Sequence, residues 1–153
     1  MLFKLLGDLI RPSHPAPAPE VAEREPVWPL QTRHTGALTL IIPSVASRAA
    51  LFERALEVLS KTQVKWKILV TDHSEDSKSG VLAAIAQRFP ALNIEFIYHA
   101  PDAHFVERIT DCAAQATTAY VALHADDDFL ITTATESCID RLESDAACAA
   151  VSV

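Results

Sequence analysis

Residues 121–131 read Val-Ala-Leu-His-Ala-Asp-Asp-Asp-Phe-Leu-Ile, an apolar run interrupted by three adjacent carboxylates. Nothing in the apolar flanks can neutralise these charges, and such a cluster at the end of a buried strand usually needs a cation. Side chains alternate along an extended segment, which would place Asp126 and Asp128 on one face and Asp127 on the other. Mg²⁺ and Mn²⁺ accept one or two carboxylates and complete their shell with water and phosphate oxygens. The triplet therefore favours a metal-assisted site for a phosphorylated ligand.

The same triplet allows a simpler interpretation. Aspartate is a frequent helix N-cap, and Asp128 precedes Phe-Leu-Ile-Thr-Thr, where a helix could begin. A solvated acidic turn that caps a helix would need no metal. Both hypotheses stay open on the triplet alone, and the rest of the chain has to separate them.

Composition narrows the classes of function. The chain has 153 residues, enough for one domain with a real core, and its formal net charge is −7. An acidic domain lacks the basic surface expected of a nucleic-acid-binding protein, so direct DNA or RNA binding is not expected. Only three glycines occur, and neither a GxGxxG motif nor a Walker A loop can be written from them. A bound phosphate would therefore need a metal in place of a glycine-rich cradle.

The first 36 residues differ from the rest. Six of the nine prolines lie between Pro12 and Pro29, a composition typical of an extended linker. We therefore divide the chain into an N-terminal segment and proline-rich linker, residues 1–36, and a folded domain, residues 37–153. Residues 1–10 form an apolar run that is too short to span a bilayer, but this run could make weak contact with a membrane. The three cysteines form no CxxC pair, and free thiols fit a reducing cytoplasm.

Strand and helix patterns alternate along the folded domain. Continuous apolar runs predict strands at 38–42, 66–71, 94–98 and 120–124, and a fifth, cut off by the chain end, at 149–153. Helical spacing predicts helices over 48–61, 81–89, 105–116 and 132–143, with Ser47 as a plausible N-cap of the first. This alternation indicates right-handed βαβ units and a mostly parallel sheet.

Polar residues follow two of the predicted strands. One strand ends in Thr-Asp-His-Ser-Glu-Asp at 71–76, and another delivers the aspartate triplet. Ligands of parallel α/β sheets bind at the carboxyl ends of the strands, where the strand order reverses. The convergence of polar groups on this edge favours the functional interpretation of the triplet over the simple cap.

Three segments of the chain resemble the nucleotide-sugar-binding half of family 2 glycosyltransferases. They read Leu-Thr-Leu-Ile-Ile-Pro-Ser at 38–44, Ile-Leu-Val-Thr-Asp-His-Ser at 68–74 and Thr-Ala-Tyr-Val-Ala-Leu-His-Ala-Asp-Asp-Asp-Phe at 118–129. Their order and spacing match the family, the likeness covers roughly residues 37–153, and the triple aspartate followed by phenylalanine suits one bacterial subgroup best. Each motif is weak alone, but the three together in register are strong.

The resemblance implies a GT-A fold, a Rossmann-like and mostly parallel sheet flanked by helices, and a nucleotide-diphosphate sugar donor that is often UDP-linked. Pro43 and Ser44 would end the first strand beside the nucleoside, and Asp72 would accept a hydrogen bond from the base. A local Asx turn is the alternative for Asp72. Arg108 lies near the family's arginine–asparagine pair, displaced by one residue, and would contact the donor. Its alternative is an exposed helical arginine.

The family's metal motif is DxD-like, and the resemblance implies Mn²⁺ or Mg²⁺ as cofactor. Asp126 and Asp128 satisfy the motif literally, and Asp126 would also touch the donor. Alignment on Tyr120 instead matches Asp127 and Asp128 to the family's later two aspartates. All three aspartates are therefore candidate metal ligands, and the pair that holds the metal stays open.

In this family the acceptor site and the catalytic base lie downstream of the metal motif, so the base is expected beyond Val153. We therefore predict an incomplete glycosyltransferase, inactive alone, acting in the cytoplasm on a glycan or lipid acceptor, with a peripheral inner-membrane location if residues 1–10 make contact. The alternative is a remnant or interaction module that binds a nucleotide sugar and transfers nothing. A phospho-acceptor regulator is disfavoured, because no acidic pair follows the first strand and no lysine occurs after Lys78.

Overall fold

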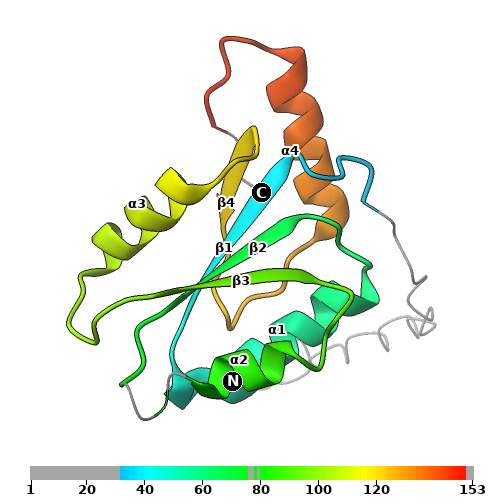
Figure 1. Cartoon of the computed structure of the whole chain (residues 1–153). Helices are drawn as coiled ribbons and strands as arrows, with labels where there is room; N and C mark the ends of the chain where they lie inside the picture. The colour runs from blue at the N-terminus through cyan, green and yellow to red at the C-terminus, as the bar shows by residue number, and fades with distance from the viewer. Residues whose placement is uncertain (1–31, 76–77, 79, 151–153) are drawn as a thin grey trace, which may run out of the picture.

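The computed structural model describes residues 32–75, 78 and 80–150. In these ranges strands and helices alternate, as the sequence predicts (Figure 1). The elements are β1 (Leu38–Ser44), the 3-10 helix η1 (Ala46–Arg48), α1 (Ala49–Lys61), β2 (Lys67–Asp72), α2 (Gly80–Ala86), β3 (Asn93–Tyr98), α3 (Phe105–Gln115), β4 (Tyr120–Leu123) and α4 (Thr132–Ser144).

The four strands form one parallel sheet in the order β3-β2-β1-β4. Leu40 of β1 is in register with Ile68 of β2 on one side and with Ala122 of β4 on the other. The chain therefore steps from β1 to β2 to β3 in one direction and then returns to the opposite side of β1. This reversal confirms the predicted α/β class and places the switch in strand order at the carboxyl ends of β1 and β4.

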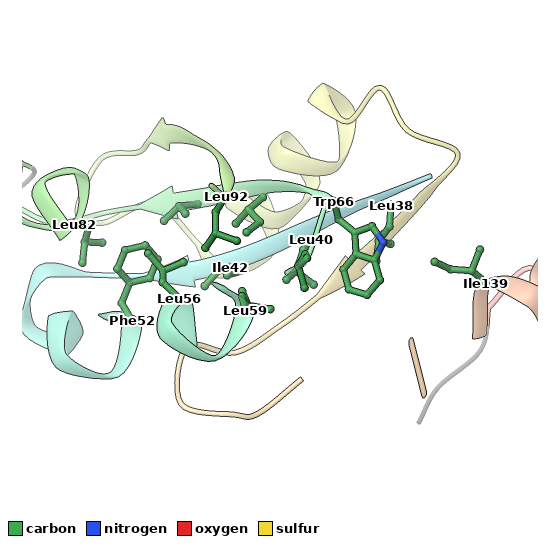
Figure 2. Close-up of a cluster of buried hydrophobic side chains, with 13 residues drawn as sticks. Leu38, Leu40, Ile42, Phe52, Leu56, Leu59, Trp66, Leu82, Leu92 and Ile139 are labelled. Carbon is green, nitrogen blue, oxygen red and sulfur yellow. The ribbon is translucent and has the colours of Figure 1, made fainter. Parts of the chain in front are cut away.

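Helices cover both faces of the sheet (Figure 1). Alternate residues of β1 point to opposite faces, so Leu40 joins the large cluster that contains α1 and α2, whereas Ile41 joins a small cluster with Cys112 of α3. Figure 2 shows the large cluster, which runs from Leu82 of α2 at one end, past side chains of β1 and α1, to Trp66, with Ile139 of α4 beyond it. Each fully buried large apolar side chain contributes about 1.5–3 kcal/mol, so this face carries most of the hydrophobic stabilisation.

Helix α1 forms because its apolar residues recur at helical spacing. Phe52, Ala55, Leu56 and Leu59 are all buried and lie on one stripe against the sheet. The predicted cap was wrong, because Ser47 lies inside η1 and Arg48 is the residue that precedes α1, without a side-chain capping bond. The Arg48 side chain is used elsewhere, at the carboxyl end of β4.

The segment before β1 packs on α4. One carboxylate oxygen of Glu136, Oε2, accepts the backbone N–H groups of Arg33 at 3.1 Å and His34 at 3.2 Å. The Glu136 side chain is almost fully buried. Next to this segment, the Oγ1 atom of Thr32 accepts the N–H of Lys65 at 3.2 Å. Because carboxylate-to-amide bonds are charge-assisted, the two Glu136 contacts hold residues 33 and 34 along α4.

Some expectations fall outside the described residues or differ from them. The linker and the membrane-contact segment lie within residues 1–31, which the structure does not describe. The predicted fifth strand is not formed by Ala149 and Ala150, and its remaining residues, 151–153, also lie outside the described ranges. Across the described chain, no helix is both long enough and apolar enough to span a membrane.

Candidate functional site at the carboxyl ends of the strands

The aspartate triplet lies directly after β4, where the chain leaves the sheet. The N–H of His124 still donates to the carbonyl of Ile41 at 2.9 Å, but Asp126 and Asp127 form a turn, and the N–H of Asp128 donates to the carbonyl of Ala125 at 3.3 Å. The extended geometry that would place Asp126 and Asp128 on one face is therefore wrong. The helix-cap interpretation is wrong as well, because α4 begins four residues after Asp128, with Ile131 in the capping position.

Asp126 is the buried member of the triplet, with 4 % of its surface exposed. The Ser44 hydroxyl donates to Oδ2 at 2.6 Å, and Arg48 donates through Nη2 to Oδ1 at 2.6 Å and through Nε to both oxygens at 2.9 and 3.1 Å. A buried carboxylate is costly unless it is paired and hydrogen-bonded, and both of its oxygens are satisfied here. Asp126 therefore fastens the turn to the end of β1 and to the start of α1.

Asp127 and Asp128 face solvent. The Nη2 atom of Arg48 lies 2.9 Å from Oδ2 of Asp127, and this hydrogen bond holds the pKa of the Asp127 carboxyl below its ordinary value. Hydrogen bonds to Asp126 first, and then to Asp127, raise the pKa of Arg48, which stays charged. Asp128 makes no side-chain hydrogen bond or ion pair with any residue that the structure describes. Phe129 is also exposed, with the guanidinium of Arg54 4.5 Å from its ring centroid.

Asp72 ends β2 and is 1 % exposed. Its Oδ1 atom accepts both the N–H of Ser74 at 2.8 Å and the hydroxyl of Ser74 at 2.5 Å, which is the predicted Asx turn. Its Oδ2 atom is buried and has no hydrogen-bond partner among the described residues. Leaving a buried acceptor unsatisfied costs about 1–3 kcal/mol, which makes Oδ2 a candidate ligand contact.

A cleft of about 350 Å³ opens at the ends of β1 and β2. Its lining comes from the segments that follow β1, β2 and β3, with the residues Val45, Ala46, Ser47, His73, Ser74, Glu75, Lys78 and Pro101. The hydroxyl of Ser74 accepts the N–H of Ala46 at 2.7 Å, so the same serine that binds Asp72 also joins the loops after β1 and β2. The cleft therefore has a fixed wall directly after the buried Asp72.

Arg108 projects from α3 and is buried, with 5 % of its surface exposed, so the expectation of an exposed helical arginine is wrong. Its Nη1 atom lies 2.8 Å from Nδ1 of His73, and its Nε atom is buried without a partner in the described chain. A guanidinium can only donate, so Nδ1 must accept, and its 3.1 Å contact with the carbonyl of Ser44 is then not a hydrogen bond. Burial, followed by the charge of Arg108, lowers the pKa of His73, which agrees with a neutral ring.

The structure brings the predicted residues together in two groups around β1. Ser44 and Asp126 touch directly, whereas Asp72 and Arg108 lie on the β2 side with the cleft. Pro43 stays within β1, half-buried and opposite Thr71 of β2. Sequence reasoning missed Arg48 altogether.

The exposed carboxylates of the turn are oxygen ligands of the kind that a divalent cation binds. No group of three or more His, Cys, Asp or Glu side chains within the described ranges is arranged to hold a metal. A cation bound here would therefore take the exposed carboxylates of Asp127 and Asp128 and complete its shell with water and phosphate oxygens. Both oxygens of Asp126 already accept hydrogen bonds from Ser44 and Arg48.

Comparisons with known proteins agree with this architecture. No protein-family model matches the chain, and no curated protein matches it by sequence. Among solved structures, the mannosyltransferase PcManGT from Pyrobaculum calidifontis, in complex with GDP-Man and Mn²⁺, matches 75 % of the chain with a TM-score of 0.60 and 17 % identity. S. aureus TarS, residues 1–349, matches 70 % of the chain with a TM-score of 0.56 and 17 % identity.

These matches cover only part of each glycosyltransferase structure. The chain spans 35 % of the length of the mannosyltransferase structure and 32 % of the TarS structure. At this level of identity the likeness concerns the fold, and the chain has the GT-A-like α/β fold of these glycosyltransferases.

Proposed function

We propose that this chain carries the donor-binding half of a metal-dependent family 2 glycosyltransferase, which transfers a sugar from a nucleotide diphosphate to a glycan or lipid acceptor. The observation that carries the proposal is a buried, unpartnered carboxylate oxygen of Asp72 beside a cleft, with an acidic turn across β1, at the strand-order switch of a GT-A-like sheet. The mannosyltransferase with a similar fold holds GDP-Man and Mn²⁺ in its structure, which supports a nucleotide-sugar ligand.

Asp72 is proposed to bind the base, and its bonding pattern favours uracil over guanine. Guanine presents two adjacent donors, N1–H and the 2-amino group, which together need both oxygens of one carboxylate. Oδ1 of Asp72 already accepts two hydrogen bonds from Ser74, so only Oδ2 is free. Uracil presents the single N3–H donor, which one oxygen satisfies. A UDP-sugar therefore fits this site better than a GDP-sugar.

The diphosphate is proposed to lie over the ends of β1 and β4. Asp127 and Asp128 would hold a Mn²⁺ or Mg²⁺ ion, which when bound neutralises the diphosphate and stabilises it as it departs. Ser44 would contribute through the bond that fixes Asp126, and Pro43 would shape the strand end beside the nucleoside. Arg108 keeps one buried N–H group, at Nε, on the β2 side, and this group would donate to the nucleotide sugar.

The acceptor half is proposed to come from outside the described residues. Transfer requires a base that deprotonates the acceptor hydroxyl, and none of the residues assigned above to the donor takes this role. A cytoplasmic location, peripheral at the inner membrane through residues 1–10, completes the proposal.

Calorimetry of nucleotide binding tests the proposal. UDP should bind the protein more tightly than GDP, and more tightly with Mn²⁺ than with a chelator. Asp72→Ala should weaken UDP by about 1–3 kcal/mol, the usual cost of losing a buried hydrogen-bond partner. Asp128→Asn should remove the effect of Mn²⁺ and leave metal-free UDP affinity unchanged.

The control variant is Glu107→Gln, which removes an exposed carboxylate on α3. It should bind UDP as the wild type does. If folded wild-type protein binds neither UDP nor GDP, with or without Mn²⁺, the proposed function is wrong. If UDP binds equally with metal and with chelator, the metal assignment alone is wrong.

A further inference from the structure

Arg48 occupies the position from which a cation would neutralise the acidic turn. Its guanidinium makes four contacts of 2.6–3.1 Å with Asp126 and Asp127, and it comes from the residue that precedes α1 rather than from the loop itself. A cation at a helix N-terminus is disfavoured by the helix dipole. The two carboxylates therefore account for the presence of an arginine here.

We propose that Arg48 is the resident counter-cation of this turn, and that an incoming divalent cation displaces it from Asp127 while it remains on Asp126. The proposal rests on the proposed function in one respect, the assignment of Asp127 and Asp128 as the metal-binding pair. It makes Arg48 a positioning residue. The Arg48 side chain would hold the turn in shape when no metal is bound, and it would leave the Asp127 carboxylate when a metal binds there.

The nitrogens of Arg48 divide their contacts in a way that permits this exchange. Nε lies 2.9 and 3.1 Å from the two oxygens of Asp126 and contacts no other carboxylate that the structure describes. Nη2 is shared, at 2.6 Å from Asp126 and 2.9 Å from Asp127. A small rotation about the Nε contact would therefore move Nη2 away from Asp127 while Nε keeps its contacts with Asp126.

Burial decides which contact breaks first. The Asp126 side chain is 3 % exposed and also accepts the Ser44 hydroxyl, whereas the Asp127 side chain is 52 % exposed. Exposed ion pairs contribute little to stability because water and salt screen them. A buried carboxylate that loses its cation has no such compensation. The metal would therefore compete with Arg48 at Asp127 and leave Asp126 paired.

Competition between Arg48 and a metal ion for Asp127 predicts the direction in which an Arg48 variant changes metal affinity. Arg48 lowers the apparent affinity of the turn for metal by the fraction of molecules in which it holds Asp127. For an exposed pair this amounts to about twofold to fivefold. Arg48→Gln should bind Mn²⁺ alone more tightly than the wild type by that factor, measured by electron paramagnetic resonance of free Mn²⁺. Arg48→Lys should lie between the two, because lysine keeps the charge but cannot contact both carboxylates with a planar fork.

A matched control is Arg141→Gln, which removes another arginine–carboxylate pair, with Asp145 at 2.8 Å. It should bind Mn²⁺ as the wild type does. Wild-type affinity, or weaker affinity, in a folded Arg48→Gln variant would overturn the proposal. So would an absence of Mn²⁺ binding in both proteins.

The wild-type protein provides a second test that needs no folded variant. In ¹⁵N spectra the Nε–H signal of Arg48 should be protected from exchange without metal. On addition of diamagnetic Mg²⁺ it should shift and stay protected, while the amide signals of Asp127 and Asp128 shift with it. Loss of Nε–H protection, or no shift while those amides respond, would overturn the proposal.

These outcomes are separable from those of the proposed function. If Mg²⁺ displaces Arg48 from Asp127 but the protein binds no nucleotide, the glycosyltransferase proposal is refuted and the proposed role of Arg48 stands. A protein that binds UDP with metal while Arg48→Gln leaves Mn²⁺ affinity unchanged would do the reverse.

Discussion

Replacing Asp126 by asparagine should destabilise the protein by about 2 kcal/mol, even though the triplet offers two neighbouring aspartates. Asp126 accepts the Ser44 hydroxyl and the Arg48 guanidinium while almost fully buried. Hydrogen bonds to charged groups contribute about 1.5–3 kcal/mol each. Asparagine keeps one acceptor oxygen, and Arg48, 40 % exposed, can still reach Asp127 and water, so the full sum is not lost. For a domain of this size, about 2 kcal/mol corresponds to a fall in Tm of about 8 °C.

Urea unfolding followed by circular dichroism measures this loss, and Asp128→Asn is the matched control. Asp128 has no side-chain partner in the described chain, so its variant should lie within about 0.5 kcal/mol of the wild type. Double-mutant cycles with Arg48→Gln should give a clear coupling energy for Asp126 and a smaller one for the exposed Asp127. Unchanged stability of Asp126→Asn, or stronger coupling to Asp127, would refute this assignment of the buried anchor.

Two further predictions concern other parts of the fold. Burial and the charge of Arg108 hold the pKa of His73 below its ordinary value of 6.5. As the pH is lowered, His73 is therefore protonated in the unfolded chain before it is protonated in the folded protein. The free energy of unfolding should therefore fall as the pH drops from about 6.5 towards 5, and His73→Gln should flatten that slope, as checked by urea unfolding across this range. Glu136→Ala should free the segment around Arg33, so trypsin should cleave after Arg33 faster than in the wild type. Mass spectrometry would detect this, and an unchanged rate would show that the two backbone bonds of Glu136 do not hold the segment.

Most of the fold follows from local sequence. The run at 38–44 is apolar on both faces, as a central parallel strand must be, and both of its faces are covered in the structure. Helix α1 follows from the spacing of its buried residues. Boundaries were less predictable, because Ser47 looks like a cap by composition but the chain enters α1 through a 3-10 turn instead.

The site was predictable in position but not in geometry. The carboxyl ends of parallel strands share one edge, so Asp72 and the triplet were expected near β1, and the structure places both there. Period-two alternation failed for the triplet because the strand ends at Leu123. The partners that shape the turn are distant in sequence, with Ser44 82 positions and Arg48 78 positions from Asp126. No local pattern encodes such contacts.

The unpaired polar atoms separate the part of the site that folding completes from the part that it leaves open. Around Asp126, Ser44 and Arg48 satisfy both carboxylate oxygens, which is the pattern of a structural anchor. Asp72 and Arg108 differ, because each keeps one buried atom without a partner among the residues that the structure describes, and they lie on the cleft side of β1. Folding alone gains nothing from burying these atoms, since each costs about 1–3 kcal/mol. A ligand that donates to Asp72 and accepts from Arg108 would recover that cost on binding. A nucleotide, which carries both a base donor and anionic oxygens, has that combination of groups.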